Sequence, residues 1–247
     1  MHKPIISGTL GNQSEKFKNY KKRISISIDT NSHIKSEVNI YLQIEPEELL
    51  NHNWLTSHYK EFDIILCWEE KLLSLPNSKL FPFGTCWIDS NKNYKKEFAI
   101  SHIYSNKTQL PGHSIRQRVG NVLKQHNIKY LNISTPPRIE AKEILFDGYQ
   151  YSIIIENIIK KNWFTEKLID CLVTSTIPIY YGCPNIADYF DDSYFLKFNT
   201  ETELHNILSN LSDANYYNHV QKISQNKNKA KEFVNIWKRL DTIFKTL

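Results

Sequence analysis

The stretch from residue 151 to residue 186 constrains the fold of this chain more than any other segment. It begins with a short apolar run, Tyr151 to Ile155, which is rich in β-branched residues and ends at Glu156 and Asn157. Such a run is typical of a buried parallel strand. A helical pattern starts at residue 165 and a second apolar run at residue 177. The order strand, helix, strand predicts an α/β fold with parallel strands.

Polar residues at the end of the first strand indicate a ligand site. Ligands of open α/β sheets bind beyond the carboxyl ends of the strands, where Glu156 and Asn157 are expected. The helix that follows has Thr165, Glu166 and Lys167 in its first turn. A lysine is unfavourable at this positive end of the helix dipole unless an anion lies opposite, and a phosphate would fit. A solvated surface lysine explains the pattern equally well.

Length and composition favour a globular protein that binds a small ligand. The 247 residues suffice for one large α/β domain or two modest ones. Forty per cent of the residues are apolar and 13% aromatic, which argues against disorder. The formal charge is only +5 and the charges are interspersed, which favours a small anion over nucleic acid as the partner.

Strand and helix patterns alternate on both sides of the polar stretch 89–97, which is the best candidate for a linker. We therefore predict two α/β domains, an amino-terminal one, 1–95, and a carboxyl-terminal one with terminal helices, 96–247. Strands are expected at residues 23–29, 40–44, 62–68, 98–104 and 128–133, and helices at residues 47–55, 114–125 and 233–244.

The cysteines and the hydropathy pattern bear on the compartment. Four cysteines lie far apart without C-x-x-C spacing, so we expect buried thiols and a reducing compartment. The chain has no run of about 18 apolar residues, the length that a transmembrane helix needs, and its first ten residues have no signal-peptide pattern. We expect a soluble cytoplasmic protein, at most peripheral at a membrane surface. The cysteines are Cys67, Cys86, Cys171 and Cys183.

Common cofactor and metal motifs are absent from the sequence. It contains no G-x-G-x-x-G, Walker P-loop, H-E-x-x-H or G-x-S-x-G motif, and no Asp-x-Asp pair. Asp191 and Asp192 are adjacent and fit a solvated turn better than a metal site. The histidines do not cluster with carboxylates, and His102 is expected in the core. No metal site and no cofactor are predicted.

Three ordered segments carry a resemblance to a known family. Glu156-Asn157, residues 163–168 (WFTEKL) and residues 176–182 (TIPIYYG) resemble the signature region of the α-1,3/4-fucosyltransferases, family 10 of the inverting glycosyltransferases. The continuation 182–186 (GCPNI) is similar to the bacterial-type members. Weaker matches lie upstream, at Ser105-Asn106 followed by Arg116 and at Glu45-Pro46.

The resemblance implies the GT-B fold, in which two Rossmann-like domains face one cleft, and a reaction that needs no metal. The donor, GDP-β-L-fucose, would lie mainly on the carboxyl-terminal domain. The implied activity moves L-fucose to a hydroxyl of an N-acetylglucosamine-containing glycan with inversion at the anomeric carbon, and an α-1,3 linkage is expected. The partners are then a GDP-sugar donor and a glycan acceptor.

The resemblance also implies roles for single residues. Arg116 and Lys167 would bind the diphosphate, because without a metal fixed cations must stabilise the leaving GDP. Glu45 would be the catalytic base that deprotonates the acceptor hydroxyl. Glu166 and Asn157 would hydrogen-bond the ribose or the sugar, and Glu156 would support that wall. The donor site would be completed by Ser105, Asn106, Trp163, Thr165 and Tyr181.

Alternatives remain open at several of these positions. Arg118 lies two residues from Arg116, and Asn157 and Tyr181 could be simple strand-end and packing residues. Trp163 stands where many family members have a tyrosine, so another GDP-sugar could be the donor. A non-catalytic module that binds a nucleotide or a polyanion is the rival from another class, and the lysine-rich segment 222–231 motivates it. Rivals of Glu45 as the base are Glu47, Glu48, Glu69 and Glu70.

Overall fold

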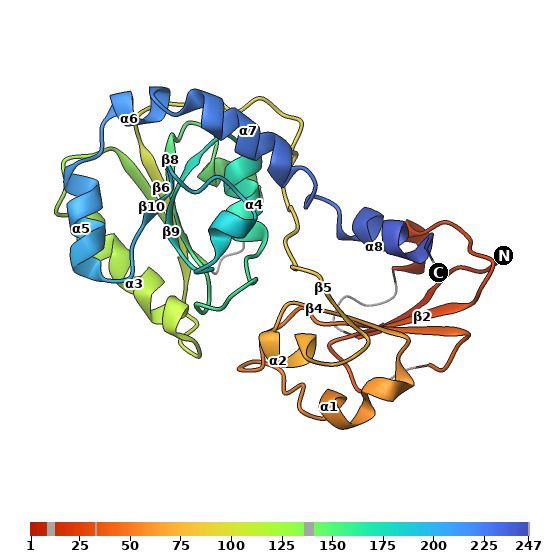
Figure 1. Ribbon diagram of the computed structural model, residues 1–247. Coiled ribbons are helices and arrows are strands. Elements are labelled where there is room, and N and C mark those ends of the chain that lie inside the picture. Colours follow the sequence, from red (N-terminus) through yellow and green to blue (C-terminus); the bar gives the residue numbers. More distant parts are fainter. Residues whose placement is uncertain (9–12, 33, 136–140, 247) are drawn as a thin grey trace. The chain divides into compact units, whose positions relative to one another are not determined.

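The computed structural model describes residues 1–8, 13–32, 34–135 and 141–246, which form two compact units (Figure 1). The amino-terminal unit comprises residues 1–83, 161–163 and 235–247, and the carboxyl-terminal unit comprises residues 84–160 and 164–234. Each unit contains one five-stranded parallel sheet. The expected class, two parallel-sheet α/β domains, is confirmed.

The sheet of the amino-terminal unit has its strands in the order β1-β2-β3-β4-β5, so each new strand is added on the same side. All four pairings are parallel. The short helices α1 (Leu55–His58) and α2 (Glu70–Leu73) follow β3 and β4, and two 3-10 turns are η1 (Ser14–Lys16) and η2 (Tyr59–Glu61). The strands are β1 (Ile5–Gly8), β2 (Ile24–Ile28), β3 (Val38–Leu42), β4 (Ile64–Cys67) and β5 (Ser78–Leu80).

Alternation along the strands gives this sheet two apolar faces. In β3, Tyr41 packs with the cluster that contains Leu55 of α1 and Leu72 of α2. Its neighbours Ile40 and Leu42 belong to a second cluster, on the opposite face. Because both faces are apolar, each needs a cover, and the short helices α1 and α2 supply only one.

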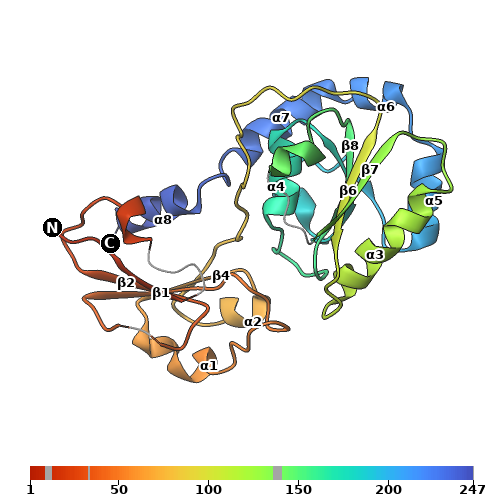
Figure 2. The same cartoon turned by 180° about the vertical axis from the view of Figure 1, so that it is seen from behind.

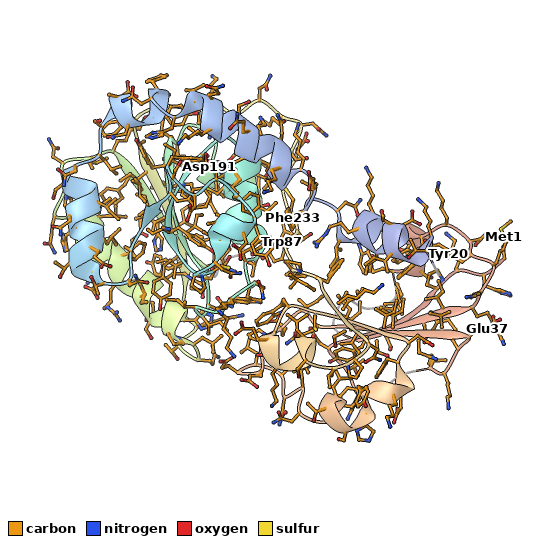
Figure 3. All side chains as sticks on the ribbon, viewed as in Figure 1. Met1, Tyr20, Glu37, Trp87, Asp191 and Phe233 are labelled. Atoms are coloured by element: carbon orange, nitrogen blue, oxygen red, sulfur yellow. The ribbon has the colours of Figure 1, made fainter. Side chains whose placement is uncertain are left out.

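Helix α8 (Ile236–Phe244) covers the second face (Figures 1 and 2). Ile236, Leu240 and Phe244 recur every four residues, so they form one buried stripe against the strands. The hydroxyl of Tyr20 donates to the Asp241 carboxylate on this helix, and Figure 3 shows Tyr20 beside it.

The division into units therefore differs from the expected ranges 1–95 and 96–247. The first unit ends at Phe83 rather than at residue 95, and α8 at the end of the chain packs with the amino-terminal unit. The physical reason is the uncovered sheet face, which the apolar stripe of α8 buries. The other segment that belongs to the amino-terminal unit, against expectation, is short and comprises residues 161–163.

The sheet of the carboxyl-terminal unit has the order β10-β9-β8-β6-β7 and is parallel throughout. Helices α3 (Pro111–Leu123) and α5 (Glu201–Ser209) cover one face, and α4 (Glu166–Val173) and α7 (Val220–Ala230) cover the other (Figures 1 and 2). The strands are β6 (Ile100–Ser105), β7 (Tyr130–Thr135), β8 (Tyr151–Ile155), β9 (Ile177–Tyr181) and β10 (Leu196–Lys197). The smaller helices are η3 (Lys142–Leu145), η4 (Ile186–Asp188) and α6 (Asp213–Tyr217).

The strand order of this second sheet reverses at β6. The chain adds β7 on one side of β6 and then returns to add β8 on the other. The connections that leave β6 and β8 therefore run to opposite faces, α3 to one and α4 to the other. A reversal of this kind opens a crevice at the carboxyl ends of the two strands, which is where open α/β sheets bind ligands.

Most expected elements are present within a few residues of their predicted bounds, but the prediction of a helix at residues 47–55 was wrong. Residues 47–50 form turns closed by the Pro46 carbonyl, which accepts the amides of Leu49 at 2.9 Å and Leu50 at 3.0 Å. An Asn51 side chain that accepts the amide of Asn53 at 2.8 Å continues the turns, because asparagine competes well for local backbone amides.

Among the helices of the described ranges, none is both long and apolar enough to span a bilayer. The segment 136–140 lies outside the described residues.

The packing of α8 predicts the effect of Leu240→Ala. This fully buried side chain belongs to the cluster of the amino-terminal sheet, so its truncation should lower the free energy of unfolding by about 2–5 kcal/mol. Urea unfolding followed by tryptophan fluorescence reports on this unit, because Trp54, Trp68, Trp163 and Trp237 belong to it. The exposed Lys238→Ala on the same helix is the control, and equal unfolding midpoints for the two variants would contradict the assignment.

Candidate functional site

The candidate site lies at the carboxyl ends of β6 and β8 in the carboxyl-terminal unit. Glu156 and Asn157 follow β8 directly, and the amide of Glu156 continues the sheet by donating to the Tyr181 carbonyl at 2.8 Å. Helix α3 begins close to the same point, because the Gly112 amide donates to the Asn157 carbonyl at 2.9 Å. The start of α3 and the end of β8 are thereby held together.

Two glycines permit this close packing. A β-carbon at Gly112 would lie 1.9 Å from the carbonyl oxygen of Glu156, so no other residue fits between α3 and β8 without a shift of the backbone. A β-carbon at Gly182, after β9, would lie 2.8 Å from Cγ of Glu156 and 2.5 Å from the Tyr180 hydroxyl. Both glycines therefore leave room for Glu156 and the backbone around it.

Arg116 lies on α3 one turn after Gly112, so its side chain faces the same end of β8. Its Nη2 donates to the side-chain oxygen of Asn157. The residue is only 9% exposed, and its Nε has no hydrogen-bond partner within the described ranges. Burial lowers the pKa of Arg116, while the carboxylates of Glu156 and Glu166 act to raise it. A buried guanidinium with an unused donor is well suited to bind an anion.

Glu156 and Lys167 form the centre of the site. The fully buried carboxylate of Glu156 accepts the Thr165 amide at 2.8 Å and the Thr165 hydroxyl at 2.9 Å. Its Oε2 also lies 3.3 Å from Nζ of Lys167, whose side chain is 20% exposed. Thr165 is the N-cap of α4 and accepts the Lys167 amide at 3.4 Å. Lys167 is therefore not a solvated surface lysine, because an internal carboxylate balances its charge.

Glu166 lies between two ammonium groups. Its Oε1 is 3.7 Å from Nζ of Lys167 and 3.5 Å from Nζ of Lys142. Burial is the largest single influence on the pKa of Glu166 and raises it, but the two lysines and hydrogen bonds outweigh it, so the pKa lies below the ordinary value. The carboxylate is therefore ionised at neutral pH.

His113 also belongs to this site, although no pattern in the sequence singled it out. It lies one turn before Arg116 on α3, its Nδ1 accepts the Leu110 amide at 3.2 Å, and its side chain bonds Asn157. Burial, with repulsion from Arg116, Lys107 and Lys167, lowers the pKa of His113. The imidazole is therefore neutral at pH 7 and adds no charge beside the two cations.

The other residues of this unit that were predicted to bind the sugar donor lie at the same edge of the sheet. Ser105 ends β6 and its carbonyl accepts Nε2 of Gln117 at 3.2 Å, while Asn106 is exposed. Tyr181 ends β9 and is buried, with its ring 5.9 Å from that of Phe198. The structure thus brings the predicted residues of β6, β8, β9, α3 and α4 to one edge, and their contacts with a donor stay a prediction.

Trp163 lies elsewhere, because the short segment 161–163 belongs to the amino-terminal unit. Its indole Nε1 donates to the Ile44 carbonyl at 3.4 Å, and Trp68 donates to the same oxygen at 3.0 Å. The two indole rings lie 5.8 Å apart, and both are buried. Trp163 therefore packs against the segment that carries Glu45, and its expected contact with the donor stays a prediction.

The backbone of Glu45 is fixed by a buried polar network. The Asp29 carboxylate accepts the amides of Ile44 at 2.8 Å and Glu45 at 3.0 Å. Nε2 of His52 lies 3.0 Å from the Glu45 carbonyl, and Nδ1 lies 2.9 Å from the Tyr41 hydroxyl. Burial lowers the pKa of His52, so a neutral ring that donates through Nε2 and accepts at Nδ1 satisfies both contacts.

The rival residues have different surroundings. Arg118 pairs with Glu201 at the surface, which supports the choice of Arg116 from the two arginines of α3. The buried carboxylate of Glu69 accepts Nε2 of Gln43 at 3.0 Å, and Glu70 pairs with Lys161 at 2.9 Å. Glu47 and Glu48 are exposed, whereas Glu45 is half-buried.

The remaining titratable residues behave largely as predicted. His102 is fully buried and its Nδ1 bonds Asn132 at 2.8 Å, which confirms it as a core residue. Asp191 and Asp192 lie in an exposed turn near Lys222 at 3.9 Å and Lys197 at 2.7 Å. Within the described ranges no three His, Cys, Asp or Glu side chains are arranged to hold a metal, and independence of metal stays a prediction. The four cysteines are free thiols, three of them buried.

Sequence comparisons with known proteins give a short match to a fucosyltransferase. No family model matches the chain. A curated relative, the α-(1,3)-fucosyltransferase FucT of Helicobacter pylori, is 32% identical over 59 residues. The match spans 24% of this chain and only 12% of that relative.

Solved structures match over most of the chain. An α1,3-fucosyltransferase with GDP has a TM-score of 0.53 and 16% identity, and one with GDP-fucose has 0.51 and 15%. Both matches cover 87% of this chain and 79% of the other. A mutant of TarM from S. aureus, in complex with UDP and other ligands, has 0.52 and 10% identity over 85% of this chain and 52% of the other. At these identities the likeness shows a shared fold.

The buried polar network that fixes the Glu45 backbone predicts the effect of Asp29→Asn. The carboxylate serves two amides and an asparagine has only one acceptor oxygen, so one amide loses its partner at a cost of about 1–3 kcal/mol. Urea unfolding followed by tryptophan fluorescence measures this loss. Asp63→Asn is the control, because Asp63 is exposed and, within the described part of the chain, its carboxylate accepts a single amide, that of Asn39 at 2.8 Å. An equal loss in both variants would show that the paired hydrogen bonds of Asp29 add no more stability than the single one of Asp63.

Proposed function

We propose that this chain is an inverting, metal-independent glycosyltransferase. It moves L-fucose from GDP-β-L-fucose to a hydroxyl of an N-acetylglucosamine-containing glycan and forms an α-1,3 linkage. The observation that carries the proposal is the convergence of Arg116, Asn157 and Lys167 on the switch point of the second sheet. The fold shared with α1,3-fucosyltransferases bound to GDP and to GDP-fucose supports the choice of donor.

The leaving group explains why two cations are needed. When the bond between the anomeric carbon and the diphosphate breaks, GDP gains negative charge, and fixed donors in a dry site stabilise that charge well. The unused Nε of Arg116 and the ammonium of Lys167 are the donors we assign to the diphosphate. The first turn of α4 adds the positive end of the helix dipole.

The base completes the reaction. We assign to Glu45 the removal of the proton from the acceptor hydroxyl. In the same step, the oxygen of that hydroxyl bonds to the anomeric carbon. The carbon–oxygen bond to the diphosphate breaks in the same step, and its electron pair leaves with GDP. Because attack comes from the face opposite GDP, the β-linked donor gives an α-fucoside. The half-buried position and the fixed backbone of Glu45 support this role.

A second candidate is a non-catalytic module that binds a nucleotide or a polyanion. Helix α7 supports it, because Lys222, Lys227 and Lys229 give the helix a basic character. Such a module would bind anions with a steep dependence on salt and would not turn over. A transferase that uses another GDP-sugar is the third possibility, and turnover with a panel of donors separates all three.

Turnover in EDTA tests the proposed reaction and its base together. With GDP-fucose and a panel of N-acetylglucosamine-containing acceptors, the wild-type chain should form an α-fucoside and release GDP in EDTA. Glu45→Gln should lower kcat at least about 100-fold, the usual contribution of a general base. Exposed Glu47→Gln is the control. Absence of transfer from every GDP-sugar would overturn the proposed activity, and full activity of Glu45→Gln would overturn the base alone.

Two substitutions test the leaving-group site. Arg116→Ala and Lys167→Ala should each raise the activation free energy by about 2–3 kcal/mol, as loss of one such donor typically does. Steady-state kcat/KM for the donor measures the effect. Arg118→Ala is the matched control, since it removes an arginine from the same helix that pairs with Glu201 at the surface. Equal kcat/KM for all three variants would reject the assignment.

A further inference from the structure

Lys142 connects a distant part of the chain to the first turns of α4. It lies in η3, yet its Nζ is 2.6 Å from Oδ2 of Asp170 and 3.5 Å from Oε1 of Glu166. Glu166 and Asp170 are four residues apart, so they lie on one side of α4. Lys142 therefore bridges two buried carboxylates of the same helix.

The position of this ammonium group is well defined. The Lys142 side chain is only 19% exposed, and its Nζ lies 4.6 Å from the centre of the Trp87 ring. The second oxygen of Asp170 accepts the Trp87 amide at 2.9 Å. Figure 3 shows Trp87 beside α4. Asp170 and Trp87 thus hold Lys142 in place next to Glu166.

The charges alternate along this part of the molecule. Asp170, Lys142, Glu166, Lys167 and Glu156 follow one another with alternating sign, and each is within 3.7 Å of the next. Lys167 is shared between the two glutamates. An anion that draws Lys167 toward itself must weaken these two contacts. Glu166 would then keep one cationic partner, Lys142.

We propose that Lys142 is a positioning residue of the donor site, which holds the Glu166 carboxylate in place and so leaves Lys167 available to the diphosphate. The proposal rests on the proposed function of this site. Without Lys142, Glu166 has Lys167 as its remaining ion-pair partner in the described structure. Glu166 would then compete with the diphosphate for that lysine, and the hydroxyl groups of the donor would meet a carboxylate that has moved.

The electrostatics agree with this geometry. The groups that face Glu166 are Lys167 and Asp170 on α4, Lys142 on η3 and Arg116 on α3. Burial raises the pKa of Glu166, and Lys167 and Lys142 lower it. Removal of Lys142 therefore raises the pKa of Glu166. The protonated form of Glu166, which cannot form an ion pair with Lys167, then appears at a higher pH.

Calorimetric titration of the full chain with GDP tests the proposal. Lys142→Met should weaken GDP binding about tenfold at pH 7.5, the size expected when a charged hydrogen-bond partner is lost. The deficit of Lys142→Met relative to the wild type should shrink as the pH falls, because protonated Glu166 no longer competes with the diphosphate for Lys167. Lys142→Arg should restore most of the affinity, because it keeps the charge. Lys129→Met is the control, since it removes an exposed lysine that pairs with Glu97 at 2.9 Å in the same unit.

A double-mutant cycle separates positioning from a purely structural role. In a Glu166→Gln background, Lys142→Met should change the affinity less than about twofold, because its target is gone. An equal loss in both backgrounds, or unchanged GDP affinity of Lys142→Met, would overturn the inference alone. Absence of GDP binding by the wild-type chain would overturn the proposed function as well. Lys142→Gln replaces Lys142→Met in the same cycle if the latter does not fold.

Discussion

The buried carboxylate of Glu156 is the interaction on which the rest of the site depends. It joins the end of β8 to the start of α4, because it accepts the amide and the hydroxyl of Thr165 and pairs with Lys167. An isolated buried charge would be costly, and these three partners offset that cost. The first turn of α4 is therefore held in a defined position at the switch point of the sheet.

An internal anion also sets what the site can bind. Lys167 already has one carboxylate at 3.3 Å and another at 3.7 Å, so its charge is largely balanced in the unbound protein. A single negative charge has little advantage over these partners. The diphosphate that we propose carries more charge and would also bond Nε of Arg116, which has no hydrogen-bond partner within the described ranges. We therefore expect the site to prefer a multiply charged ligand over a singly charged anion.

Local pattern predicted the centre of the site, and tertiary contacts determined the rest. The strand 151–155 and the helix that follows were predicted from the sequence, because an apolar run and a Thr-Glu start are local signals. Lys142 could not be selected, since its partners Glu166 and Asp170 lie more than 20 residues later, on α4. The apolar stripe of α8 was visible, but its pattern does not say which sheet the helix covers. The same holds for Trp163, whose neighbours Trp68 and Ile44 are remote in sequence.

In the proposed function, Arg116 and Lys167 bind the diphosphate of a GDP-sugar at the switch point of the second sheet. A crystal structure of the full chain with GDP shows whether they do. We expect diphosphate oxygens within about 3.2 Å of Nε of Arg116 and Nζ of Lys167, and a longer distance between Nζ of Lys167 and Oε2 of Glu156 than the present 3.3 Å. GDP bound away from the ends of β6 and β8, with Lys167 still paired to Glu156, would contradict this proposal.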